Sequence, residues 1–467
     1  MKRLELDPDR AFPAEPGTRA LARQIYAATA DLPLVCMHGH VDVRILADDV
    51  PFADPASMLI TPDHYVTRLI HSAGVPLEDL GIGPDAQRDP RQIWRTFCAH
   101  WHLFRGTPSR FWLTHELVDV FGVDLAPSAE TADAIYDQIA ARLAEPAFRP
   151  RALLDRFRIE LLATTDSPIA SLANHHRLHA DGYAGRVIPT FRPDPLLYLD
   201  HDSWTTEVAE LTRLTDIDTG SYKGFLAALA KRREDFIAAG ALATDHGHRT
   251  ADTTPLPDSE AERIYAARLA GTISAAEADA FAAHMLFEMA RMSIEDGLVL
   301  QLHPGVLRDH HRGVRARYGT DRGFDIPVPV DFVRGLRPLL EAFGREPRLR
   351  MIVFTVDETT YSRELAPLAG VYPALKLGAP WWFLDSPEGM MRFRQAVTET
   401  AGFYNTTGFV DDTRAFASIP ARHDLARRID AAYLARLVAE GHLDLDEAIQ
   451  TAVDLAYHIP RAAYARR

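Results

Sequence analysis

The stretch Leu34-Val-Cys-Met-His-Gly-His40 decides the fold assignment. A short apolar run of this kind is typical of a buried strand, and this one ends in two histidines that are two positions apart. Side chains at that spacing point to the same face of a strand, so both imidazoles can reach one metal ion. The stretch therefore predicts a strand with a pair of metal ligands, His38 and His40, at its carboxyl end. The alternative is two histidines in a polar turn.

Seven further apolar runs follow, and most are separated by helical patterns such as residues 281–292 and 330–343. This alternation predicts parallel strands with crossover helices, and eight strands favour an α/β fold of the (β/α)8 TIM barrel type. A doubly wound open sheet is the alternative, but it calls for a Gly-rich turn after the first strand, and His38-Gly39-His40 is not one. The further predicted strands span residues 159–165, 186–192, 241–246, 298–303, 351–355, 374–378 and 407–412.

The length of the chain is compatible with one large domain. Its 467 residues would suffice for about three average domains, yet an α/β barrel can carry this much chain as one folding unit. The excess length lies mainly between the first two predicted strands, where residues 44–156 carry several helical patterns. We expect a single domain over residues 1–467, with a helical insertion at 44–156 above the barrel mouth.

Composition excludes several classes of protein. A hydrophobic fraction of 47% and a charged fraction of 25% are typical of globular proteins and rule out disorder and fibrous architecture. The net charge of −14 disfavours nucleic acid and anionic lipid as partners. Two isolated cysteines predict neither a disulfide scaffold nor a CxxC site, which fits the reducing cytoplasm. Without a long apolar run we expect no membrane insertion. The composition is compatible with either a monomer or a homo-oligomer.

Two histidines are too few for a catalytic metal site, so another strand end must supply a third ligand. Asp412 and His303 both qualify, and such a site suits one divalent cation, with zinc as the first expectation. The structural alternative for His303 is a hydrogen-bonded core histidine. For Asp412 it is the N-cap of a helix that starts near Thr413.

Further polar side chains follow the predicted strands. Arg192 closes the third strand and Arg414 follows the eighth, and a guanidinium in a barrel mouth can clamp a carboxylate through two hydrogen bonds. We therefore expect an anionic small molecule as the substrate, unless each arginine only pairs with a framework aspartate. Asp245 could contact this substrate, and Trp381 could offer an apolar wall or simply pack in the core.

Together these motifs resemble the uronate isomerases of the amidohydrolase superfamily over nearly the whole chain. The blocks that carry the resemblance, in order, are His38-Gly39-His40, Asp63-His64-Tyr65, Ala163-Thr-Thr-Asp166, Pro189-Thr-Phe-Arg-Pro-Asp194, Thr244-Asp-His-Gly247, Leu300-Gln-Leu-His303, Trp381-Trp-Phe383, Asp411-Asp-Thr-Arg414 and Arg422-His423. The family's opening Asp-Tyr-His-Cys-His is Cys36-Met37-His38-Gly39-His40 here. Ligand and charge positions survive, which suggests a divergent member.

The resemblance implies a metal-assisted interconversion of D-glucuronate with D-fructuronate, and of D-galacturonate with D-tagaturonate, through an enediolate. It implies that Asp412 is a metal ligand that takes part in proton transfer, that Arg414 polarises the carbonyl end, and that Tyr65 assists at a hydroxyl. By the same resemblance Arg192 would hold the C6 carboxylate, while Asp245 and Trp381 would contact the rest of the sugar.

Two other functions remain as alternatives. The same ligand set could activate water in a mononuclear hydrolase of a lactone, ester or amide. Thr244-Asp245-His246 stands where many binuclear hydrolases of the superfamily carry a lysine, which argues for one metal. A sugar-binding barrel without activity is disfavoured by the joint presence of the two histidines, Arg192, Asp412 and Arg414.

Overall fold

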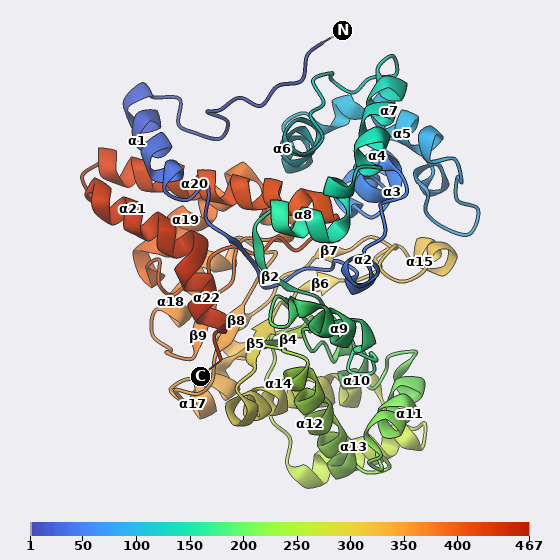
Figure 1. The fold of residues 1–467 in the computed structure, drawn as a ribbon. Helices are drawn as coiled ribbons and strands as arrows, with labels where there is room; N and C mark the ends of the chain where they lie inside the picture. The colour runs from blue at the N-terminus through green and yellow to red at the C-terminus, as the bar shows by residue number, and fades with distance from the viewer. Residues whose placement is uncertain (1, 467) are drawn as a thin grey trace.

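The computed structural model describes residues 2–466 and has an α/β fold with two parallel sheets (Figure 1). The first sheet has the order β1-β2-β3 and the second the order β4-β5-β8-β9. Their strands are β1 (Leu34–Cys36), β2 (Ile159–Ala163), β3 (Val187–Ile188), β4 (Ala243–His246), β5 (Val299–Leu302), β8 (Met351–Val353) and β9 (Leu375–Leu377). The expected α/β class with parallel strands is confirmed, and each of these strands lies within a predicted run.

Isolated contacts extend the two sheets towards each other. A single parallel bridge joins Phe191, beyond β3, to Thr244 of β4, and another joins Leu377 of β9 to Thr406. Beyond the strand ends, the Asp412 N–H donates to the carbonyl of His38. Ladder hydrogen bonds nevertheless join the parallel strands of the described residues into two separate sheets, and a closed eight-stranded ring stays a prediction.

The predicted strand at residues 407–412 is wrong. This segment carries no strand hydrogen bonding beyond the bridge at Thr406, although it runs beside the other strand ends. Gly408 has φ 77° and Asp412 has φ 44°, and these left-handed conformations interrupt an extended backbone. Most of the segment is buried, so its apolar character reflects burial and not membership of a ladder.

Seven α-helices lie between β1 and β2, within the segment expected to be helical (Figure 1). They are α2 (Val43–Asp48), α3 (Pro55–Leu59), α4 (His64–Ser72), α5 (Pro90–Ala99), α6 (Pro108–His115), α7 (Ala132–Leu143) and α8 (Pro150–Arg156). Trp94, Phe97 and Phe104 form part of a buried core that these helices share with Ile159 of β2. The side chain of Asp63 caps α4 by accepting from the Tyr65 N–H, and this fixes where that helix begins.

Of the remaining helices, one precedes the first strand and the others lie between later strands or follow the last one. They are α1 (Pro16–Ala27), α9 (Ala173–Leu178), α10 (Asp194–Leu197), α11 (Trp204–Thr215), α12 (Tyr222–Ala238), α13 (Asp258–Leu269), α14 (Ala275–Asp296), α15 (Arg312–Tyr318), α16 (Phe332–Gly335), α17 (Arg337–Phe343), α18 (Ala366–Ala369), α19 (Pro387–Ala401), α20 (Ile419–Ala439), α21 (Leu445–Val453) and α22 (Ile459–Tyr464). The first helix, α1, packs against two of the later helices, α20 and α21 (Figure 1).

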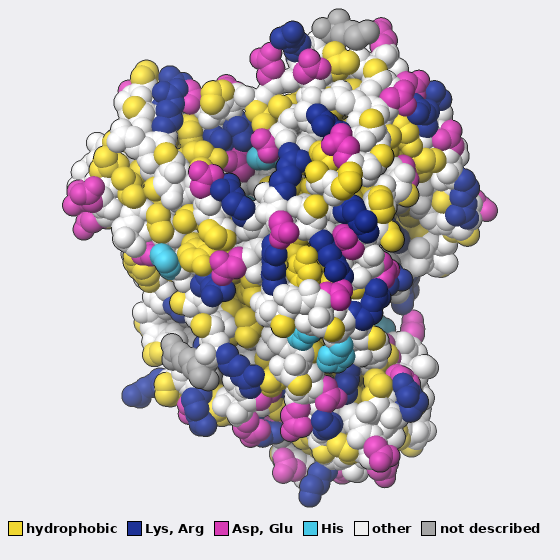
Figure 2. Space-filling view, viewed as in Figure 1, with side chains coloured by type: hydrophobic (Ala, Val, Ile, Leu, Met, Phe, Trp, Pro, Cys, Tyr) yellow, Lys and Arg dark blue, Asp and Glu magenta, His cyan; other side chains and the backbone are white. Residues whose placement is uncertain are grey.

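A short antiparallel pair, β6 (Val306–Leu307) and β7 (Ile326–Pro327), encloses α15. This pair was not predicted, since two-residue strands carry no periodic pattern. Within residues 2–466, no helix combines the length and the hydropathy needed to span a bilayer. Acidic and basic side chains are interspersed over the face drawn in Figure 2.

Candidate active site

His38, His40 and Asp412 converge, although they come from opposite ends of the chain. Asp412 Oδ1 lies 3.2 Å from His40 Nε2 and 3.5 Å from His38 Nε2. His38 is buried, and neither of its ring nitrogens has a hydrogen-bond partner among the described residues. Buried polar atoms are rarely left unpaired, so this donor set fits a divalent cation held by two imidazoles and one carboxylate.

The charge states of these groups suit a metal. Burial lowers the pKa of His38 to about 4, against the opposing pull of Asp245 and Asp412, so its ring is neutral near pH 7. Burial raises the pKa of Asp412, but the hydrogen bond from His40 and the nearby histidines outweigh burial and hold it well below its usual range. Neutral imidazole and ionised carboxylate are the forms that bind metal.

His303 lies beside this group but outside it. Its Nε2 is 3.0 Å from Oδ1 of Asp245, and the cluster of potential ligand atoms does not include it. Asp245 has no exposed surface and also faces His38 Nδ1 at 3.5 Å and Arg192 Nη1 at 3.4 Å. The Asp245 carboxylate thus lies within 3.5 Å of two histidines and an arginine and can orient all three. A direct metal bond for His303 and a sugar contact for Asp245 both stay predictions.

A cavity of about 1840 Å³ opens above the cluster and is lined by both predicted arginines. Arg192 pairs with Asp194 at 3.0 Å, and Arg414 pairs with Asp321 at 3.4 Å. Trp381 forms part of the wall and packs edge-on against His38, with ring centroids 4.9 Å apart. The cavity can therefore offer positive charge, an apolar surface and a metal position to one small molecule.

Tyr65, at the start of α4, also lines the cavity and is buried. Its hydroxyl donates to Asp385 Oδ1 at 3.0 Å, and Arg422 lies 3.2 Å from Oδ2 of the same carboxyl group. Burial raises the pKa of Asp385 to about 6, although Arg422 opposes this shift. The tyrosine hydroxyl is therefore held by a charged network beneath the cavity floor.

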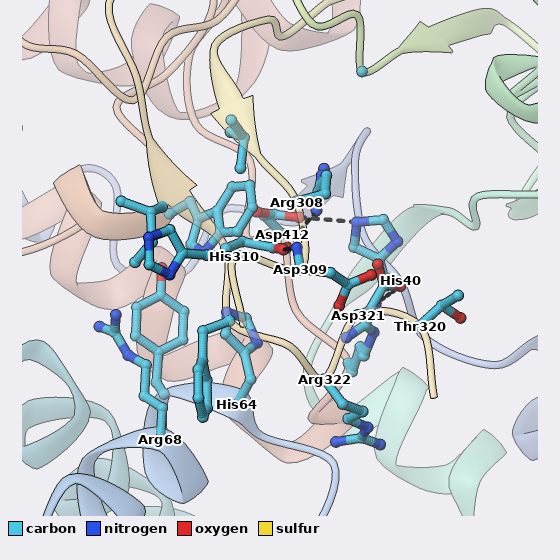
Figure 3. Close-up of a pocket in the computed structure, with 18 of the residues that line it drawn as sticks. His40, His64, Arg68, Arg308, Asp309, His310, Thr320, Asp321, Arg322 and Asp412 are labelled. Carbon is cyan, nitrogen blue, oxygen red and sulfur yellow. Dashed lines mark hydrogen bonds and ion pairs between the residues drawn. The ribbon is translucent and has the colours of Figure 1, made fainter. Parts of the chain in front are cut away.

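Several cavity residues were not singled out from the sequence. His64 has a buried Nε2 without a hydrogen-bond partner among the described residues, and burial, with Arg414 nearby, lowers its pKa to about 3. Arg308 and Asp321 come from the segment between β6 and β7, and Figure 3 shows them close to His40 and Asp412. The block Asp63-His64-Tyr65 could have indicated His64, whereas no local sequence pattern indicated Arg308 or Asp321.

Comparisons with known proteins find similar sequences and structures over nearly the whole chain. A sequence model of the family described as glucuronate isomerase matches residues 17–464. A uronate isomerase of Rhizorhabdus wittichii is 57% identical over 99% of this chain and 98% of its own length. The crystal structure of glucuronate isomerase from Caulobacter crescentus has a TM-score of 0.97 and 50% identity, covering 99% of this chain and 97% of that one. For uronate isomerase from Thermotoga maritima these values are 0.93 and 27%, covering 99% and 100%.

Proposed function

Because the chain belongs to the uronate isomerase family, we propose that its cavity interconverts D-glucuronate with D-fructuronate, and D-galacturonate with D-tagaturonate. The observation that carries this assignment is the convergence of His38, His40 and Asp412 beneath a cavity lined by Arg192 and Arg414. An aldose–ketose isomerisation oxidises C2 and reduces C1 of one molecule, so it needs no external oxidant. The family membership favours this reaction over hydrolysis of a lactone, ester or amide.

We infer that one divalent cation, zinc in our proposal, is held by His38, His40 and Asp412. A cation in this position supplies positive charge that stabilises the developing negative charge on the sugar oxygens. The unpaired ring nitrogens of His38 and the ionised state of Asp412 support this inference. His303 is assigned to orienting His38 through their common partner Asp245, and a direct bond to the metal would revise that role.

The proton transfers are assigned to residues of the cavity. Asp412 accepts the proton from C2 of the open-chain aldose and returns it to C1, while a second proton moves from O2 to O1. Arg414 donates hydrogen bonds to the carbonyl oxygen and stabilises the enediolate that forms. Tyr65 donates to a sugar hydroxyl, and Arg192 holds the C6 carboxylate. The ring of Trp381 covers one face of the sugar.

We further infer that the two sheets form one (β/α)8 barrel in a single domain, with residues 44–156 as an insertion over its mouth. The bridges at Thr244 and Thr406 and the hydrogen bond from Asp412 to His38 support closure of the ring. The helix α4, which contributes His64 and Tyr65 to the cavity, supports the placement of the insertion. Cys36 and Cys98 are both free and buried, which suits a cytoplasmic enzyme.

The activity is tested by incubating the zinc-loaded protein with D-glucuronate or D-galacturonate in deuterated water. We expect NMR to show loss of the aldose C1 signal and growth of the ketose. Deuterium at C1 of the ketose would report a base that exchanges its proton with solvent. Protein stripped with a chelator serves as the control. If neither uronate reacted but lactones were hydrolysed, the protein would be a metal-dependent hydrolase and not an isomerase.

The role of Arg192 predicts a defect in substrate binding. We expect Arg192→Met to raise KM for both uronates about 10–100-fold, because a charged bidentate contact to the carboxylate is lost. The matched control is Arg249→Met, which removes another arginine from the same cavity. Steady-state kinetics checks this, and an unaltered KM would remove the role. Circular dichroism should accompany the assay, since Asp194 and Asp245 lose a partner.

A further inference from the structure

A second group of metal-ligand side chains lies among buried residues next to the candidate active site. Cys36 ends β1, Asp411 directly precedes Asp412, and His423 lies in α20. All three are buried, with exposed fractions of 0%, 1% and 5% respectively. Their potential ligand atoms lie within 4.8 Å of one another. None of the three is a ligand in the site described above.

The distances in this group are those of ligands around one tetrahedral ion. Cys36 Sγ lies 3.5 Å from His423 Nε2, and His423 Nε2 lies 3.3 Å from Asp411 Oδ2. Zinc bonds of about 2.3 Å to sulfur and about 2.0–2.2 Å to nitrogen or oxygen place tetrahedral ligands roughly 3.3–3.6 Å apart. Both observed distances agree with that geometry.

Hydrogen bonding alone does not satisfy the same atoms. An imidazole nitrogen has one proton or one lone pair in the ring plane, yet Nε2 of His423 faces both the sulfur and the carboxylate. The second carboxylate oxygen, Asp411 Oδ1, is buried and has no hydrogen-bond partner among the described residues. Leaving a buried acceptor unsatisfied is costly. A cation between the three groups would bind Nε2 of His423 through its lone pair and would give the Asp411 carboxylate the partner that it lacks.

We propose that Cys36, Asp411 and His423 bind a second divalent cation of the zinc class, separate from the catalytic one. The thiol proton is released to solvent on binding, and the resulting thiolate and the carboxylate balance the two charges of the ion. Thiolate ligands select zinc over harder cations such as magnesium. This ion joins β1, α20 and the segment that carries Asp412, so it positions the catalytic carboxylate without contacting the substrate.

The direct test is X-ray absorption at the zinc edge of the full-length zinc-loaded protein. The ligands of the catalytic site are all nitrogen and oxygen, so a zinc–sulfur distance of about 2.3 Å would come from a cysteine site. We expect this sulfur signal, with an average of one sulfur for every two zinc ions. Zinc bound only to nitrogen and oxygen would overturn the proposal and leave the group as a hydrogen-bonded core cluster.

Cobalt loading and a pair of variants identify the cysteine. Cobalt bound to thiolate gives an intense near-ultraviolet charge-transfer band, which we expect in the wild-type protein and in Cys98→Ser but not in Cys36→Ser. Cys98 is the other buried cysteine, and among residues 2–466 it belongs to no group of potential metal ligands. A band that survives Cys36→Ser, or its absence from the wild type, would refute the assignment.

Metal counting completes the test. We expect Cys36→Ser to lose one zinc ion per chain relative to both the wild type and Cys98→Ser. Asp194, His246 and His248 form a further cluster without sulfur, so a change in stoichiometry is interpreted together with the sulfur signal. If Cys36→Ser does not fold, the absorption spectrum of the wild-type protein still decides the question. An unchanged zinc content in a folded Cys36→Ser would contradict the proposal.

Discussion

Replacing Asp412 by asparagine is expected to lower kcat for D-glucuronate by at least about a thousandfold, because one change removes both the proposed charged metal ligand and the group that we assign to proton transfer. Its Oδ1 is the atom within 3.5 Å of both His38 and His40, so the cluster loses its only carboxylate. An amide is neutral and does not accept a proton near pH 7. Measurements of kcat and of zinc per chain check this expectation.

The control for Asp412→Asn is the same change at an exposed position. Asp331 caps α16, and asparagine is an equally good N-cap, so Asp331→Asn should leave both kcat and zinc content unchanged. Because the proposed cysteine site uses other ligands, Asp412→Asn should retain the sulfur-bound zinc. If Asp412→Asn kept a kcat within about tenfold of the wild-type value, Asp412 would be excluded as the proton acceptor.

The second large effect concerns stability. Arg422→Met is expected to lower the free energy of unfolding by about 3–5 kcal/mol, the usual cost of removing one partner of a buried ion pair. Arg422 is 1% exposed, lies 3.2 Å from Asp385 and 3.8 Å from Asp63, and stacks over the ring of Trp112. Methionine fills part of the volume but leaves both carboxylates without their cation. Urea unfolding followed by circular dichroism measures the change.

The stability defect of Arg422→Met should depend on pH in a defined direction. The pKa of Asp385 is already raised to about 6 in the folded protein, and loss of the guanidinium raises it further. A carboxyl group with a raised pKa binds more protons folded than unfolded, so its contribution to stability falls as pH rises through that pKa. We expect a larger deficit at about pH 8 than at about pH 5. Arg334→Met, at an exposed site, should show neither effect.

Local patterns were enough to predict the parallel strands and the pair of histidines that the structure places beside Asp412. In Leu34-Val-Cys-Met-His-Gly-His40 the apolar run forms β1, which ends at Cys36, and the two histidines follow shortly after it, so no distant information was needed to place them together. The failure at residues 407–412 has the opposite cause. Whether an apolar segment joins a ladder depends on its neighbours and on backbone angles such as the positive φ of Asp412, which propensity does not encode for aspartate.

The sequence did not predict which side chains form ion pairs with one another in the folded protein. Arg192 and Arg414 were identified as cavity residues, but their partners Asp194 and Asp321 follow from tertiary structure. The same holds for Asp245, whose complete burial between His38, His303 and Arg192 has no local signature. A short strand pair such as β6 and β7 brings Arg308 to the cavity without any hydrophobic period to reveal it.

The order of the three proposed ligands along the chain also has a consequence for biosynthesis. A nascent polypeptide still on the ribosome holds His38 and His40 long before Asp412 emerges, and α20 is made later still. Such long-range contacts form late, and N-terminal regions are exposed first. The proposed metal site is thus expected to form only after the chain has been made through Asp412, so a product truncated before that residue would lack one of the three proposed ligands as well as α20, which packs on α1.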